Sequence, residues 1–275
     1  MKISILTLFP KMISSFFEES IVRRAQEKGI VEISIVDLRE FSSDSYKTVD
    51  NKPYGGGVGM VMKVDVISKA LSAAADPAAP QPLKSSIDSP SDFGDLRVAP
   101  PTAAVKIIYT SPKGKPFTQK KAQEYTKLEH LIILAGHYEG VDERVMDFVD
   151  EEISLGDFVM TGGEIAAGAI CDAVTRLLPG VLKKEEATMV ESFYEIEVEK
   201  LIKVVGERPE LAKLIEKNIK TVQLLEYPQY TRPEEFQGER VPTVLLSGNH
   251  AEIEKWQITQ AFEQTRKKRP DLLEK

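Results

Sequence analysis

Two glycine-rich segments contain the residues of this sequence best suited to form a ligand site. Residues 135–144 read Ala-Gly-His-Tyr-Glu-Gly-Val-Asp-Glu-Arg and follow the apolar run 131–135. Residues 155–164 read Leu-Gly-Asp-Phe-Val-Met-Thr-Gly-Gly-Glu and also leave a short apolar run. Because glycine has no side chain, a ligand can reach the backbone N–H and C=O groups there. Two such turns at the same edge of one sheet would form a pocket.

A third glycine cluster lies at residues 50–60, Asp-Asn-Lys-Pro-Tyr-Gly-Gly-Gly-Val-Gly-Met. It is not a Walker A loop, because no Gly-Lys-Ser/Thr follows, and neither of the other segments matches Gly-x-Gly-x-x-Gly. A simpler interpretation applies to all three, in which the glycines only turn the chain and the third cluster is flexible filler. The alternative is that the three segments lie against one large ligand.

The histidines and the cysteine do not indicate a metal or redox site. His130, His137 and His250 show no metal-ligand spacing, so no bound metal is predicted from them. Cys171 is the only cysteine and lies in an apolar helical pattern, which predicts a buried and unreactive thiol. The net charge of −7 argues against a protein that holds nucleic acid by charge alone. The basic cluster at 266–269 is typical of a solvated helix end.

The composition is that of an ordinary globular protein, with 275 residues, 42% of them hydrophobic and 29% charged. This length predicts two domains. No run approaches the roughly 18 apolar residues of a membrane helix, and the N-terminus lacks a basic-then-apolar signal pattern. We therefore expect a cytoplasmic protein that has no membrane partner.

A β-α-β unit opens the chain. Residues 2–8 predict a strand, the apolar residues within 12–25 recur at helical spacing, and residues 31–37 predict a second strand. The right-handed crossover rule makes such a sheet parallel, so the predicted fold class is α/β with a parallel sheet. The further elements expected in this part of the chain are a strand over 105–109 and helices over about 118–128 and 164–178.

The remaining segments suggest how the chain is divided. Residues 73–103 are rich in Ala, Pro, Ser and Asp and predict a poorly ordered insertion. A charged linker at 183–190 precedes two amphipathic helices, expected over 196–206 and 209–222. A helix over 251–266 is expected to form the core of a small C-terminal region. The expected domains are 1–182, a linker with inserted helices at 183–226, and 227–275.

Several long motifs occur in this sequence in the same order as in a known protein family. They are Leu8-Phe9-Pro10, the segments 53–60, 136–145 and 156–164, Tyr230-Thr231-Arg232-Pro233, and 246–253. In these the chain resembles the bacterial tRNA (guanine-N1)-methyltransferases, the TrmD-type members of the SPOUT superfamily, over nearly its whole length except 73–103 and about 194–223. The resemblance implies an α/β domain with a deep trefoil knot, an exception to the rule against knots, and a small helical C-terminal domain that binds tRNA.

The resemblance further implies that S-adenosylmethionine binds in the knot in a bent conformation. The bound cofactor would supply the activated methyl group, so the protein would contribute orientation and electrostatics. Glycines would admit it to backbone hydrogen bonds, and larger side chains would form apolar walls. By motif, the binding residues are Tyr109, Thr110, Ser111, Gly136, Tyr138, Gly140, Leu155, Gly156, Phe158, Met160, Gly162 and Gly163.

The acceptor that the resemblance implies is N1 of the guanine at tRNA position 37, beside the anticodon. This nitrogen carries a proton at neutral pH, so its methylation needs a general base, and a cation where charge builds up on O6. Arg176 matches the family's arginine and would be the cation. Ungapped alignment places Glu191 where the family has the aspartate that acts as general base. Glutamate has one methylene more than aspartate, which changes the pose of the carboxylate. Without the resemblance, Glu191 reads as a solvated linker carboxylate.

Further residues and partners follow from the same resemblance. Glu139 matches a glutamate needed for activity, with a structural role in its loop as the alternative. The family forms obligate homodimers, in which the knot of one subunit combines with the linker and C-terminal domain of the other. Magnesium dependence is reported for the family, and no residue here predicts a magnesium site. The residues expected near tRNA or the subunit interface are Asp50, Tyr54, Ser247, Asn249 and His250.

Two other functions remain as alternatives. One is a knotted methyltransferase that acts on a different RNA, against which the loop 54–59 and the C-terminal motifs argue. The other is an RNA-binding module without activity, against which the retained Arg176 argues. Glu191 is the residue that keeps this last alternative open.

Overall fold

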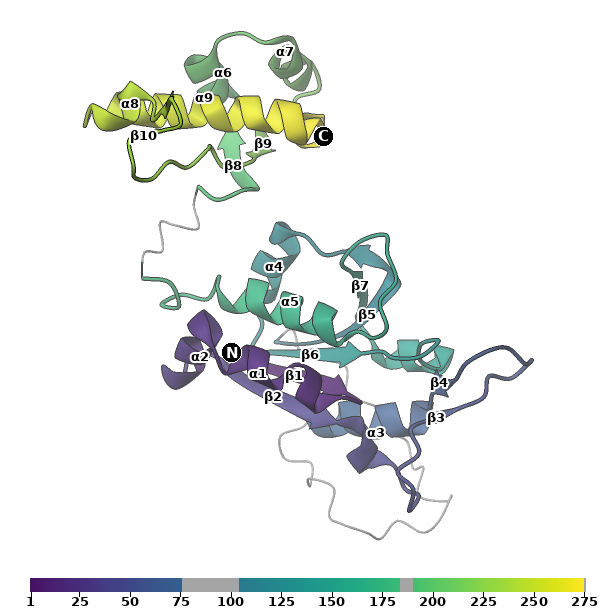
Figure 1. Ribbon diagram of the computed structural model, residues 1–275. Helices are drawn as coiled ribbons and strands as arrows, with labels where there is room; N and C mark the ends of the chain where they lie inside the picture. The colour runs from purple at the N-terminus through teal and green to yellow at the C-terminus, as the bar shows by residue number, and fades with distance from the viewer. Residues whose placement is uncertain (76–103, 184–189, 275) are drawn as a thin grey trace. The chain divides into compact units, whose positions relative to one another are not determined.

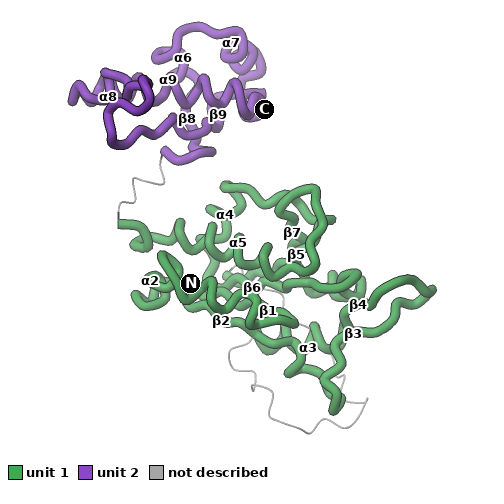
Figure 2. Tube along the Cα trace, viewed as in Figure 1, with its two compact units in different colours: residues 1–183 green, residues 184–275 purple. Residues whose placement is uncertain are grey.

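The computed structural model describes residues 1–75, 104–183 and 190–274. The chain forms two compact units, residues 1–183 and 184–275 (Figure 2). Each unit has its own hydrophobic core, and each is described separately below. No helix in the described parts of the chain is long and apolar enough to cross a membrane.

A five-stranded parallel sheet forms the centre of the first unit (Figure 1). Its strand order is β2-β1-β6-β5-β7, so the prediction of a parallel α/β sheet is confirmed. Every residue of β6 is buried, as expected for a central strand covered on both faces. The strands are β1 (Lys2–Thr7), β2 (Glu32–Asp37), β5 (Val105–Pro116), β6 (His130–Ala135) and β7 (Glu151–Ser154).

Helices cover both faces of this sheet (Figure 1). Side chains alternate between the faces of a strand, so Ile3 and Ile5 of β1 join one core cluster and Leu6 joins the other. The first cluster contains residues of α2 (Ser20–Glu27), α4 (Gln119–Tyr125) and α5 (Glu164–Thr175). The second contains residues of α3 (Val64–Ala75) and of the short helix η4 (Glu143–Phe148).

The single helix predicted over 12–25 is wrong. The segment forms three short helices, η1 (Pro10–Met12), α1 (Ser14–Phe17) and α2. Ser20 has a φ of 55°, in the left-handed region, so the helix cannot continue through it. The apolar spacing predicted the burial of Ile13, Phe17 and Ala25, but Met12 and Phe16 are exposed and the break was not predicted. The predicted insertion is also wrong at 73–75, which belong to α3, and its residues 76–103 lie outside the described residues.

The second unit combines a two-stranded antiparallel sheet with helices. Strand β8 (Tyr194–Glu197) pairs with β9 (Thr221–Leu224), where the sequence predicted two helices reaching over 196–206 and 209–222. Both predicted helices are therefore shorter than expected: α6 is Val198–Val205 and α7 is Pro209–Glu216. The remaining elements are β10 (Glu235–Phe236), β11 (Glu239–Arg240), α8 (Thr243–Leu246), α9 (His250–Lys268) and η6 (Pro270–Leu273).

Packing explains why the segment 194–224 belongs to this unit. Leu201 of α6 and Leu211 of α7 are fully buried in one cluster with Ala261 and Phe262 of α9. Trp256 of α9 is half-buried and contacts Tyr227 and Tyr230, with ring centroids 6.5 and 6.2 Å apart. The helix predicted over 251–266 is therefore present and forms the core against which the inserted helices pack.

Candidate functional site

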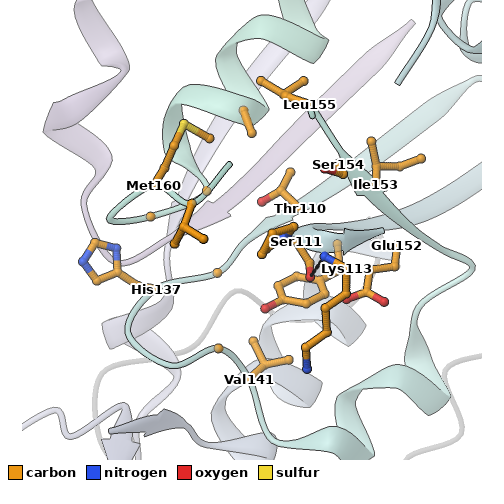
Figure 3. A pocket seen from close by; sticks show the side chains of 18 of the residues that line it. Thr110, Ser111, Lys113, His137, Val141, Glu152, Ile153, Ser154, Leu155 and Met160 are labelled. Carbon is orange, nitrogen blue, oxygen red and sulfur yellow. Dashed lines mark hydrogen bonds between the residues drawn. The ribbon is translucent and has the colours of Figure 1, made fainter. Parts of the chain in front are cut away.

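A cavity of about 270 Å³ opens where β6 and β7 end and where β5 bulges away from β7 (Figure 3). Both glycine-rich segments form its wall, as does the middle of β5. Every residue that the sequence predicted to bind S-adenosylmethionine lines this cavity, and so does Glu139. The cavity therefore brings together residues from three segments far apart in the chain. Whether they bind that ligand stays a prediction.

Three glycines in the cavity wall are required by protein packing. A Cβ on Gly136 would lie 2.7 Å from the Tyr109 ring, and one on Gly163 would overlap Oγ1 of Thr110. A Cβ on Gly162 would overlap the side chains of Glu164 and His137. Protein atoms therefore occupy the space that a side chain would take at these glycines, and ligand contact with their backbone groups stays a prediction. The segments can pack this closely only without side chains at these positions.

The third glycine cluster is fixed at its ends and exposed at its tip. It joins β3 (Asp50–Asn51) to β4 (Val61–Met62), which pair with each other. The backbone N–H of Glu139 donates to the carbonyl of Met60 at 3.1 Å, and that of Met62 donates to Gly140 at 3.0 Å. Tyr54 at the tip is fully exposed. The loop is therefore attached to the first glycine-rich segment, while its tip is free to meet a partner.

The position of Glu139 is compatible with both roles expected from the sequence, one in activity and one in the structure of its loop. It lines the cavity, and its side chain packs so closely on Gly59 that a Cβ there would lie 2.6 Å from Cγ. Gly59 also has a φ of +96°, where other residues are strained. The residue thus packs on the third cluster and also lines the cavity.

A buried carboxylate beside the cavity was missed by the sequence analysis. Glu164, at the start of α5, is fully buried, and its Oε1 accepts a hydrogen bond from Thr7 Oγ1 at 2.8 Å. Its Oε2 lies 3.6 Å from Nδ1 of His137, and neither of these two atoms has a hydrogen-bond partner in the described structure. Buried polar atoms in folded proteins usually have such a partner. The only signal in the sequence was a Gly-Gly-Glu helix start combined with a histidine in the other glycine-rich segment.

Tyrosines of the cavity wall are held neutral. Burial, with the charge of Glu152 as a lesser cause, raises the pKa of Tyr109 to about 12. The pKa of Tyr138 is raised as well, first by burial and then by the charge of Asp50, with which its hydroxyl hydrogen bonds. Asp50, predicted to lie near tRNA, therefore contacts the cavity wall. Both phenols offer hydrogen bonds without charge at neutral pH.

The two residues predicted to handle the acceptor guanine do not line the cavity. Arg176 follows the last turn of α5, and Glu164 begins that helix beside the cavity. At 1.5 Å per residue, the two ends are roughly 18 Å apart. Glu191 is part of the second unit and is half-buried. The cavity of the first unit is thus lined by neither of these two side chains.

The residues predicted near tRNA in the second unit form the corner between α8 and α9. Asn249 caps α9, with its side-chain oxygen accepting from the N–H of Glu252 at 3.4 Å. Ser247 Oγ accepts from the N–H of Asn249 at 3.1 Å and donates to the carbonyl of Val244 at 2.7 Å. His250 is exposed at the first turn. Hydrogen bonds that cap α9 and close the turn before it thus account for the residue types of Asn249 and Ser247.

No group of three or more potential metal ligands of the His, Cys, Asp or Glu types occurs among the described residues. The magnesium dependence expected from the resemblance therefore has no protein site in the described ranges.

Comparison with known proteins identifies the family. The family described as tRNA (Guanine-1)-methyltransferase TrmD matches residues 1–275. Similar proteins named tRNA (guanine-N(1)-)-methyltransferase include one from Clostridium botulinum (strain Eklund 17B / Type B), 46% identical over 99% of this chain and 92% of its own length. Another is from Caldanaerobacter subterraneus, 44% identical over 98% of this chain and 91% of its own. The resemblance inferred from the motifs is thus confirmed, and the chain belongs to the TrmD family of tRNA (guanine-1)-methyltransferases.

Proposed function

We propose that this protein transfers the methyl group of S-adenosylmethionine to N1 of the guanine at tRNA position 37, next to the anticodon. The observation that carries the proposal is the cavity, in which every residue predicted to bind the methyl donor lines one wall, in a chain of the TrmD family. The protein would act in the cytoplasm.

The cavity wall suits a ligand with both apolar and polar parts. Leu155, Phe158 and Met160 provide apolar contacts, and the backbone of 136–140 provides polar groups. The bound donor supplies a methyl group already activated for transfer. The three segments of the wall are those in which the family forms its trefoil knot, and we propose the same threading here.

Chemistry at the acceptor would need two groups. The carboxylate of Glu191 would take the proton from guanine N1, which makes that nitrogen nucleophilic toward the methyl carbon as the carbon–sulfur bond breaks. The guanidinium of Arg176 would stabilise negative charge on O6 while the proton leaves. Both side chains are of the right type for these steps, and glutamate replaces aspartate as the base.

The position of Arg176 supports an active site shared between subunits. Arg176 lies ten residues, roughly 15 Å, along α5 from Ala166 of the cavity wall, which places it far from a guanine in the cavity of its own subunit. A homodimer would resolve this, with the cavity of one subunit completed by Arg176, Glu191 and the second unit of the other. The residues proposed to contact tRNA are Asp50, Tyr54, Ser247, Asn249 and His250, so the mainly helical second unit would act as a tRNA-binding domain.

Methyl transfer from labelled S-adenosylmethionine to unmodified tRNA transcripts with G or A at position 37 tests this proposal. We expect incorporation only into the G transcript, and loss of at least about 100-fold in the Glu191→Gln variant. Glu195→Gln, an exposed carboxylate nearby in the same unit, is the matched control and should keep wild-type activity.

Each other outcome favours one of the alternatives. Incorporation into both transcripts would point to a different RNA target, and no incorporation by the wild type, with tRNA binding retained, would identify a binding module. A fully active Glu191→Gln variant would require a different base.

A further inference from the structure

We propose that Tyr46 is a platform on which an unpaired base of the tRNA stacks, held in position by the carboxylate of Asp44. This inference rests on the proposed function, because the partner is the RNA substrate of that function. It adds a specificity contact outside the cavity, on the loop 42–48 that leads into β3.

The first observation is an aromatic side chain held in solvent. Tyr46 is 91% exposed, and Tyr54 further along the same part of the chain is fully exposed. Tyrosine is well suited to stacking, because every base presents a π face.

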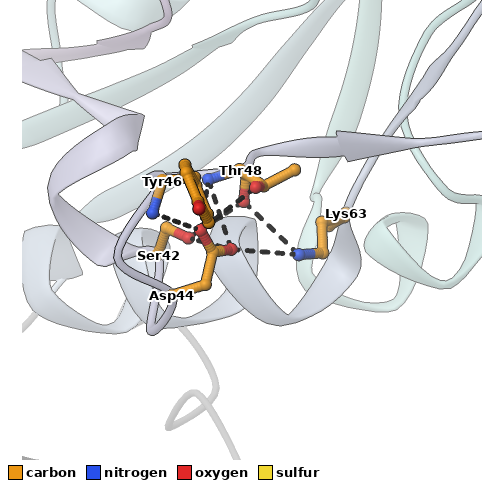
Figure 4. A network of polar contacts seen from close by, with 5 residues as sticks. All are labelled: Ser42, Asp44, Tyr46, Thr48 and Lys63. Carbon is orange, nitrogen blue, oxygen red and sulfur yellow. Dashed lines mark hydrogen bonds and ion pairs between the residues drawn. The ribbon is translucent and has the colours of Figure 1, made fainter.

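The second observation is that the loop around Tyr46 is rigidly built (Figure 4). Asp44 Oδ1 accepts hydrogen bonds from the N–H groups of Tyr46 and Thr48, at 2.9 and 3.0 Å, and from Thr48 Oγ1 at 3.0 Å. Its Oδ2 accepts from Ser42 Oγ at 3.1 Å and lies 3.8 Å from Nζ of Lys63. The backbone N–H of Thr48 is the main cause that lowers the pKa of Asp44, so the carboxylate is ionised at neutral pH.

Such a network places Tyr46 before any partner arrives. The network fixes the backbone that carries the ring, and a loop that is already ordered loses less conformational entropy on binding than a mobile one. None of these contacts buries the ring of Tyr46, so the network positions the residue for a partner and does not add it to the core.

The third observation connects this loop to the cavity. Val49 is buried, and its carbonyl accepts from the N–H of Lys63 at 2.9 Å. The next residue, Asp50, pairs with Met62 in the sheet and hydrogen bonds with Tyr138 of the cavity wall. Four residues of chain therefore connect Tyr46 to Asp50, which contacts the wall of the cavity where the acceptor guanine would lie.

Local charge favours RNA as the partner. The segment 42–63 carries Lys47, Lys52 and Lys63 against Asp44 and Asp50, whereas the whole chain has a net charge of −7. Lysines beside an exposed aromatic ring provide phosphate contacts next to a stacking surface, which is how unpaired RNA bases are commonly bound. The loop of tRNA that contains the anticodon consists of such unpaired nucleotides.

The test measures binding of an unmodified G37 tRNA transcript to the full-length protein and three variants. Tyr46→Ala should weaken tRNA binding about 10-fold, whereas Tyr46→Phe, which keeps the ring, should stay within about twofold of the wild type. Asp44→Ala should weaken binding without adding to the effect of Tyr46→Ala in the double variant, because both act through one contact. Affinity for S-adenosylmethionine should not change.

Three results would overturn the platform: wild-type tRNA affinity in Tyr46→Ala, equal losses in Tyr46→Phe and Tyr46→Ala, or a changed sedimentation coefficient in Tyr46→Ala. The last would assign Tyr46 to a contact between copies of the chain. Binding is measured separately from methyl transfer, so a wild type that binds tRNA through Tyr46 but methylates nothing would refute only the proposed function.

Discussion

The glycine-rich wall of the cavity and the corner between α8 and α9 both carry sequence motifs, but different forces shape them. In the cavity wall, Gly163 and Glu164 are specified by side chains from distant parts of the chain. At the corner, Ser247 and Asn249 are specified by backbone groups within five residues of them. The residues of a motif can therefore be determined either by long-range packing or by local helix capping. The predictions below separate the two, beginning with the largest expected effect.

Gly163→Ala should damage the cavity most. Its Cβ would overlap Thr110 Oγ1 and lie 2.9 Å from the backbone nitrogen of Gly136, so the segments must separate. We expect a loss of about 3 kcal/mol in the free energy of unfolding, measured by denaturant titration, together with loss of S-adenosylmethionine binding. Gly168→Ala is the control within α5, because its nearest neighbour is 4.0 Å away, and it should be neutral or stabilising. Equal effects of the two would refute the packing explanation.

Glu164→Ala should be the next most damaging. It leaves the buried Thr7 hydroxyl without the acceptor of its hydrogen bond and removes the carboxylate that faces His137. We expect a loss of about 2 kcal/mol, measured by thermal and denaturant unfolding. The exposed Glu129→Ala should change stability by less than about 0.5 kcal/mol. A tolerated Glu164→Ala would show that the buried pair does not hold the wall together.

Acid should weaken the first unit through His130. Burial, with a smaller contribution from the charge of Lys2, lowers the pKa of His130 to about 4 in the folded protein. The unfolded state therefore binds the proton more readily, so this contribution to stability is complete above about pH 6.5 and is lost as the pH falls toward 4.

Unfolding free energies at pH 7 and pH 5 measure this effect. The wild type should lose roughly 1.5 kcal/mol more than His130→Gln over that interval, because glutamine does not titrate. The burial of His130 distinguishes the first unit from the second, where His250 is exposed. An identical pH dependence in both proteins would contradict the assignment.

Asn249→Ala should have the smallest effect, because it removes one helix cap. We expect a loss of about 1 kcal/mol, and Asn249→Asp should restore it, because aspartate also caps helices well. Binding of S-adenosylmethionine should be unchanged in both, which would separate this local role from the packing role of Gly163. A tRNA affinity that falls in Asn249→Asp as much as in Asn249→Ala would show instead that the amide contacts RNA.

Much of the first unit follows from the sequence alone. Periodicity predicted β1, β2 and the start of β5, and the glycine spacing predicted the two segments that meet at one edge of the sheet. These patterns are local, because strand alternation and turn residues act over a few positions. The individual residues that line the cavity were selected by the resemblance to the tRNA (guanine-N1)-methyltransferases and not by these patterns.

Only the tertiary structure decided which residues face each other. The pairing of Glu164 with His137 depends on two segments that are 27 positions apart, and the exchange of helix for strand at β8 depends on β9, which comes after two helices. The distance of Arg176 from the cavity follows from the length and direction of α5, which no motif states. Such features arise because burial and hydrogen bonding are satisfied between distant parts of the chain, and local preference yields to them.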